Sequence, residues 1–172
     1  MHEPQATKAR RRRRRTNAFR AAVEATPPPT SKAYRPGLQA LSAAHRRQIS
    51  SDDSRRLTGS IDLDAALVAT QPNAPRWDYG IGYRHGRREY AVWVEVHGAQ
   101  TNKVGDVLKK LHWLKGWLAG PGERLLRLTD GGAPTPAFVW LASGPIRLPP
   151  TSRHARQASQ AGVFPRKELH IP

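Results

Sequence analysis

The stretch RWDYGIGYRHGRREYAVWVEVH, residues 76–97, decides the fold. Large apolar side chains alternate with small or polar ones on both sides of a polar link at residues 84–88, which is the pattern of two strands joined in a hairpin. In the second strand, Tyr90–His97, this alternation puts Glu95 and His97 on one face and the neighbouring valines on the other. The stretch therefore predicts a β-hairpin with polar side chains near its open end.

Helical patterns flank this hairpin on both sides. A short helix is expected over residues 62–68, and apolar side chains recur at helical spacing over Lys103–Leu118. Ala137–Ala142 is apolar on both faces, as a central, fully covered strand should be, and a last helix is expected over Thr151–Gln160. The predicted order is helix, strand, strand, helix, strand, helix, which indicates an α/β fold with a small mixed β-sheet flanked by helices.

The N-terminal third of the chain lacks a sustained apolar pattern. Residues 1–56 contain a run of arginines, three consecutive prolines and a polar stretch, so we expect a disordered Arg/Pro-rich arm. The single α/β domain is then expected to span residues 57–172. The residues of the arm that we expect to bind nucleic acid are Arg10, Arg11, Arg12, Arg13, Arg14 and Arg15.

The charge of the chain has two interpretations. Its 29 basic and 13 acidic side chains give a net charge of +16, which attracts polyanions, chiefly DNA or RNA. Arginine also outnumbers lysine 22 to 7, and alanine, proline and glycine are abundant, as in chains encoded by GC-rich genes. The arginine run therefore indicates either phosphate binding or compositional bias.

Several classes of protein are excluded by composition. There is no cysteine, so disulfide scaffolds, thiolate zinc sites and cysteine nucleophiles are ruled out. No apolar stretch reaches the ~18–20 residues that cross a bilayer, and no apolar segment follows the basic N-terminal run as in a secretory signal. We expect a cytoplasmic protein without a membrane partner.

Asp78 and Glu95 are the candidate site. If the two strands pair, their carboxylates converge, and two unit charges 4 Å apart repel by about 4 kcal/mol at an effective dielectric near 20. A shared proton, a basic side chain or a divalent cation must offset that repulsion, and carboxylate oxygens suit Mg²⁺ or Mn²⁺. Structural alternatives are an Asp78 pair with a nearby arginine or backbone amide, and a Glu95 salt bridge to a lysine of the following helix.

These residues resemble a known family. Trp77-Asp78-Tyr79, then Val94-Glu95-Val96-His97, then a helix carrying Lys109-Lys110, is similar to the core of the PD-(D/E)XK, or restriction-endonuclease-like, nucleases. The resemblance implies that Asp78 and Glu95 hold Mg²⁺ and that His97 stands where the family usually has lysine. Lys109 or Lys110 would then supply the missing charge from the helix. No proline precedes Asp78, which is a second departure. The chain is also similar to small uncharacterised bacterial proteins with a WDY…VEVH…LKKLxWLK pattern.

Three hypotheses for function follow. The first is a Mg²⁺-dependent phosphodiesterase acting on DNA or RNA, with Asp78, Glu95, His97, Lys109 and Lys110 in its site. The second is a noncatalytic nucleic-acid-binding module with a degenerate nuclease-like fold. The third is a protein-interaction domain that forms a homodimer. In this third hypothesis the dimer contact is made by Trp113 and Trp117. The same two side chains could instead stack on bases or pack under a loop.

Overall fold

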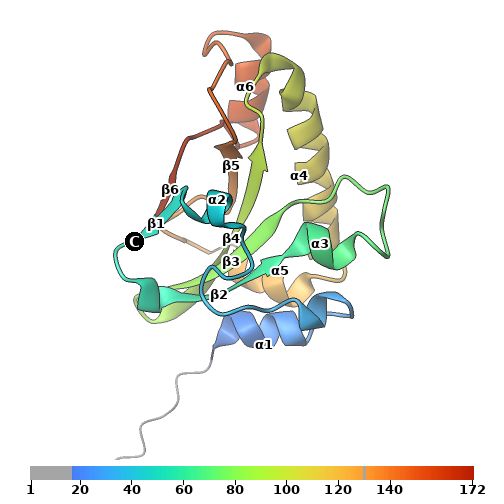
Figure 1. Ribbon diagram of the computed structural model, residues 1–172, viewed down its shortest axis with the longest axis vertical. Coiled ribbons are helices and arrows are strands. Elements are labelled where there is room, and N and C mark those ends of the chain that lie inside the picture. The colour runs from blue at the N-terminus through green and yellow to red at the C-terminus, as the bar shows by residue number, and fades with distance from the viewer. Residues whose placement is uncertain (1–16, 130) are drawn as a thin grey trace, which may run out of the picture.

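The computed structural model describes residues 17–129 and 131–172, and its elements form a mixed α/β fold (Figure 1). None of the helices in these two ranges is long and apolar enough to cross a membrane. In chain order the elements are helix α1 (Ala18–Glu24), the 3₁₀ turn η1 (Thr30–Lys32), helix α2 (Ala43–Arg46), strand β1 (Ile49–Ser51), turn η2 (Ser54–Arg56), strand β2 (Leu57–Asp62), helix α3 (Leu63–Leu67), strands β3 (Tyr79–His85) and β4 (Arg88–His97), turn η3 (Thr101–Lys103), helices α4 (Val104–Ala119) and α5 (Glu123–Thr129), strand β5 (Phe138–Ala142), helix α6 (Arg153–Gln160) and strand β6 (Leu169–Ile171).

A four-stranded mixed sheet forms the centre, in the order β2-β3-β4-β5. The hairpin pairs β3 with β4 in antiparallel register, Tyr79 opposite Val94 and His85 opposite Arg88. β5 lies parallel to β4, with Glu95 opposite Trp140, and α4 and α5 make the crossover between these two strands. This crossover and the hairpin confirm the predicted mixed sheet flanked by helices.

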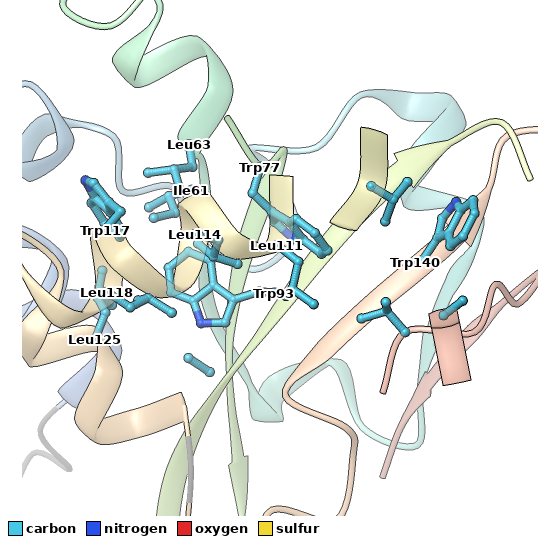
Figure 2. Close-up of a cluster of buried hydrophobic side chains, with 14 of the residues drawn as sticks. Ile61, Leu63, Trp77, Trp93, Leu111, Leu114, Trp117, Leu118, Leu125 and Trp140 are labelled. Carbon is cyan, nitrogen blue, oxygen red and sulfur yellow. The ribbon is translucent and has the colours of Figure 1, made fainter. Parts of the chain in front are cut away.

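Two hydrophobic layers cover the two faces of the sheet. Helices α1, α4, α5 and α6 pack on the face that carries Trp93 and Trp140, and Trp77 and Trp117 lie in the same cluster (Figure 2). The opposite face carries Ile81 and is covered by a small parallel sheet, in which β1 pairs with β6. The sheet is thus the middle layer, so each of its strands has both faces covered.

β5 is an edge strand rather than the central strand that its sequence predicts. Its two faces are buried, which explains its continuous apolar pattern, but β4 is its only strand neighbour in the described sheet. On the outer side the Ala142 amide donates to the Arg166 carbonyl at 2.9 Å, and the Arg166 amide donates to the Trp140 carbonyl at 3.0 Å. These two bonds protect the edge without adding a strand.

The prediction of a disordered arm reaching residue 56 is wrong for residues 17–56. Asn17 caps α1 by accepting from the Arg20 amide at 2.7 Å, and the α1 side chains Phe19 and Val23 are fully buried against the sheet. The 49–51 segment is a strand of the small sheet. Short elements that bury at most three side chains each give no sustained period, which is why the sequence pattern did not show them. The run at residues 10–15 lies outside the described residues.

Candidate functional site

Asp78 and Glu95 meet where the β3–β4 ladder ends. Asp78 directly precedes β3, and Glu95 lies on β4 opposite it, because Tyr79 pairs with Val94. Each carboxylate accepts a hydrogen bond from a backbone amide on the opposite side of the hairpin. The Asp78 amide donates to Glu95 Oε2 at 3.1 Å, and the Val96 amide donates to Asp78 Oδ2 at 2.9 Å. The Asp78 carbonyl also accepts from the Leu63 amide at 2.8 Å at the start of α3. Both carboxylates are therefore held in fixed positions.

Lys110 of α4 joins the two carboxylates. Its Nζ donates to Glu95 Oε1 and lies 3.5 Å from Asp78 Oδ1. The side chain of Glu95 is 0% exposed, whereas those of Asp78 and Lys110 are 20% and 19% exposed. The site is therefore buried at Glu95 and reaches solvent at Asp78 and Lys110, and the three side chains form a triad of two acids and one base.

The carboxyl group of Glu95 is strongly perturbed. Burial and, to a smaller extent, the charge of Asp78 raise its pKa from the ordinary 4.5 to about 8, although Lys110 opposes the shift. Burial outweighs the ion pair here because Glu95 sits on the helix-covered face of the sheet beside Trp93 and opposite Trp140. A cation of higher charge than ammonium would favour the ionised form more strongly.

A cleft of about 350 Å³ opens beside the triad. Lys110 lines it, so one member of the triad faces the cleft directly. Its walls come from the loop before β3, the end of β4 and the first half of α4. The other lining residues are Asp64, Ala74, Pro75, Arg76, His97, Asp106 and Lys109.

The sequence offers Arg76 as a possible partner of Asp78, but the structure pairs it with Asp64, and its role is to hold the loop before β3. Its Nε donates to Asp64 Oδ1 at 2.9 Å, and its Nη1 donates to the carbonyls of Gln71 and of Pro72, the latter at 3.1 Å. Its side chain is almost buried. The sequence around Arg76 contains no pattern that distinguishes an arginine that fixes a loop from one that is exposed to solvent.

The predicted site residues separate into two groups. Asp78, Glu95 and Lys110 come together, whereas Lys109 is exposed and lies one position further around the helix, in the cleft. His97 follows Glu95 on the same face and also lines the cleft, where its Nδ1 lies 3.3 Å from the Gly98 carbonyl. The salt bridge from Glu95 to a lysine of the following helix, offered by the sequence as a structural alternative, is therefore present.

The triad offers two carboxylate oxygens to a divalent cation. Asp78 Oδ1 and Glu95 Oε1 both lie near one atom, Lys110 Nζ, so two carboxylate oxygens converge on a point that already attracts positive charge. Two carboxylates completed by water are a ligand set that Mg²⁺ accepts. Within residues 17–129 and 131–172 no three His, Cys, Asp or Glu side chains group as a metal site. The donor chemistry fits, with Lys110 in competition for the same oxygens.

The two tryptophans of α4 differ in their surroundings. Trp117 is 5% exposed and packs edge-on against Trp93, with ring centroids 6.1 Å apart, so it belongs to the core and is not available to a partner or a base. Trp113 is only half-buried and stacks on Trp117 at 6.4 Å. Trp113 alone of this pair is accessible.

Comparisons with models of protein families, with curated proteins and with solved structures give no match. The function must therefore be inferred from the site itself.

Proposed function

We propose that the protein is a Mg²⁺- or Mn²⁺-dependent phosphodiesterase of the nuclease type, built on a restriction-endonuclease-like core and acting on DNA or RNA. The observation that carries the proposal is the triad: two carboxylates from neighbouring strands and one lysine from the crossover helix converge beside a cleft. Because a buried ion pair contributes little net stability, folding alone is a weak reason for such an arrangement.

Each residue has a stated role in this proposal. Asp78 and Glu95 would hold the metal ion, which when bound supplies a water of lowered pKa and neutralises charge on the phosphate. Lys110 would leave the carboxylates and orient the attacking water or the phosphate. Lys109 would bind phosphate from the next position of α4, and His97 would contact the substrate or accept a proton at the end of β4.

Cleavage of plasmid DNA, single-stranded DNA and RNA by the purified full chain should require Mg²⁺ or Mn²⁺ and stop in EDTA. We expect Asp78→Asn and Glu95→Gln each to lower the cleavage rate by at least about 100-fold, because each removes a charged ligand, and Lys110→Met to lower it to a similar extent. Gel assays of initial rate would measure this, with circular dichroism confirming that each variant is folded.

Asp106→Asn is the matched control. Asp106 lines the same cleft and carries the same charge, but it is not part of the triad, so cleavage should be unchanged. Wild-type protein that cleaves no substrate with either metal would refute the proposal. Cleavage that survives Asp78→Asn and Glu95→Gln would also refute it, since the activity would then reside elsewhere.

A second candidate function is noncatalytic binding of nucleic acid. Two observations favour it: Lys110 already occupies the point between the two carboxylates, and a second basic hollow of about 310 Å³ lies at the closed end of the β3–β4 hairpin. Arg55, Arg56 and Arg84 line this hollow with Asp53 and Gly86. Arg55 pairs with Asp53 and Arg84 with Glu89, whereas Arg56 makes no ion pair with a described residue.

Salt dependence tests this second candidate. If the hollow binds phosphate, Arg55→Ala/Arg56→Ala should flatten the slope of log affinity against log salt by up to about 2, since each phosphate contact contributes about 0.9 on duplex DNA. Arg124→Ala/Arg127→Ala, which removes two exposed charges from α5, is the matched control. Equal slopes for both double variants would exclude the hollow. Removing residues 10–15 in the same assay tests the arginine run.

A further inference from the structure

An apolar groove of about 550 Å³ lies next to the cleft of the triad. It runs between the loop before β3 and the outward side of α4, and its walls are almost entirely apolar. Pro75 and Lys109 line both the groove and the cleft, so the two adjoin at these residues. The other lining residues are Gly105, Leu108, His112 and Trp113. A molecule in the groove can therefore reach the cleft past Pro75 and Lys109.

Trp113 is held rigidly in this groove. Its Nε1 donates to Gln71 Oε1 at 3.2 Å, and its ring is stacked on that of Trp117, with an angle of 19° between the ring planes. Gln71 belongs to the loop that Arg76 fixes through its backbone carbonyls. The indole is thus oriented from both sides before any ligand arrives, which lowers the entropy lost on binding.

The combination of an apolar aromatic groove with a basic cleft selects a particular kind of ligand. Nucleotides join a flat apolar base to a phosphate, and proteins that bind single strands use aromatic side chains for the bases and basic grooves for the backbone. Lys109 stands at the junction, with Lys110 behind it in the cleft. A base within a duplex is stacked on its neighbours and cannot enter such a groove.

We propose that the groove binds an unpaired nucleobase of single-stranded nucleic acid, stacked at Trp113, while the adjoining phosphate lies at Lys109 in the cleft. This inference rests on the proposed function, because it assigns the strand that enters the same site. It deepens that function by naming the substrate class: single strands, or duplex regions with an extruded base.

Binding to the full chain in EDTA tests the groove without cleavage. The probes are short oligothymidylate, oligouridylate and an abasic oligonucleotide of equal length. Four of the five tryptophans are buried, so quenching of intrinsic fluorescence should report mainly on Trp113. We expect quenching by the two strands that carry bases, about 10-fold weaker binding of the abasic strand, and loss of that 10-fold preference in Trp113→Ala.

Two further variants test separately whether Trp113 acts by stacking on the base and whether Lys109 acts through its charge. Trp113→Phe should keep the preference for bases, because phenylalanine also stacks, but lose most of the quenching. Lys109→Ala should weaken binding of all three strands and lower the salt slope by about 1. Lys115→Ala is the matched control on the same helix, since its Nζ lies over the Phe138 ring, 5.3 Å from its centroid, and it should change neither affinity nor slope.

The outcomes distinguish this inference from the proposed function. Equal affinity for abasic and base-carrying strands would overturn the groove assignment, even if the protein cleaves duplex plasmid. Base-dependent binding lost in Trp113→Ala but without cleavage would support the groove and refute the nuclease. A homodimer in sedimentation that Trp113→Ala converts to monomer would assign the groove to a second copy of the chain and overturn the inference.

Discussion

The free energy of unfolding of the wild-type protein should fall by about 3–5 kcal/mol as the pH rises from about 4.5 to 8 in EDTA. Burial raises the pKa of Glu95 to about 8, whereas in the unfolded chain this group titrates near its ordinary value of 4.5. Between these two values the folded protein binds one more proton than the unfolded chain. Stability therefore decreases with pH, by at most about 1.36 kcal/mol for each pH unit, and this loss ends above pH 8.

Urea unfolding of Glu95→Gln measures the contribution of this one group. Glutamine keeps the shape, and its single oxygen can accept either from Lys110 or from the Asp78 amide, but it does not ionise. The variant should lack the fall and be more stable than wild type at pH 9. Glu24→Gln, at an exposed position of α1, should keep the wild-type profile. Parallel profiles for wild type and Glu95→Gln would mean that Lys110 keeps Glu95 ionised throughout.

The same substitution has opposite expected effects on stability and on cleavage. Glu95→Gln removes a buried carboxylate whose ionisation opposes folding, and it also removes a charged ligand of the proposed metal site. If removing the Glu95 carboxylate stabilises the metal-free protein, the presence of this carboxylate is better explained by a function at the site than by a contribution to folding. Measuring both quantities on one variant therefore separates a functional triad from a structural salt bridge.

Local patterns were sufficient to predict the centre of the site. Alternation along β4 places Glu95 on the face opposite the valines, and pairing of the two strands brings Asp78 next to it, as the structure has them. The sequence-based prediction does not choose between Lys109 and Lys110, although their positions on the helix differ. Lys110 is three positions after the buried Val107 and four before the buried Leu114, so it lies on the buried side of α4. Lys109 is rotated by about 100° from that position and faces the cleft.

Contacts between distant segments could not be predicted from the sequence. β1 pairs with β6 across some 120 positions, and Ile49 meets Leu169 there with nothing local to indicate it. The need for glycine at position 82 also depends on a distant segment. A Cβ at this position would lie 2.2 Å from Phe19 Cγ, so the glycine is needed for the close approach of α1 to the sheet. In the sequence it is only a small residue in an alternating strand.

Single substitutions in α1 measure how much this N-terminal segment contributes. Phe19 is fully buried in the helix-side core, so Phe19→Ala should cost about 3–5 kcal/mol of unfolding free energy. Arg20 is its exposed neighbour, paired only with Glu24 of the same helix, and Arg20→Ala should cost less than about 1 kcal/mol. The difference between these two variants measures how much the buried face of α1 contributes to stability.

A chain that begins at Leu57, where the sequence alone places the start of the domain, should fail to fold. It lacks Phe19, Val23, Leu41 and Ile49, which are buried on both faces of the sheet. Burial of each contributes about 1.5–3 kcal/mol, so together they contribute about 6–12 kcal/mol, comparable with the whole stability of a domain, about 5–15 kcal/mol. Near-ultraviolet circular dichroism and thermal melting of the truncated and full chains would measure this. A cooperative melt of the truncated chain near the wild-type temperature would instead show that residues 17–56 are dispensable.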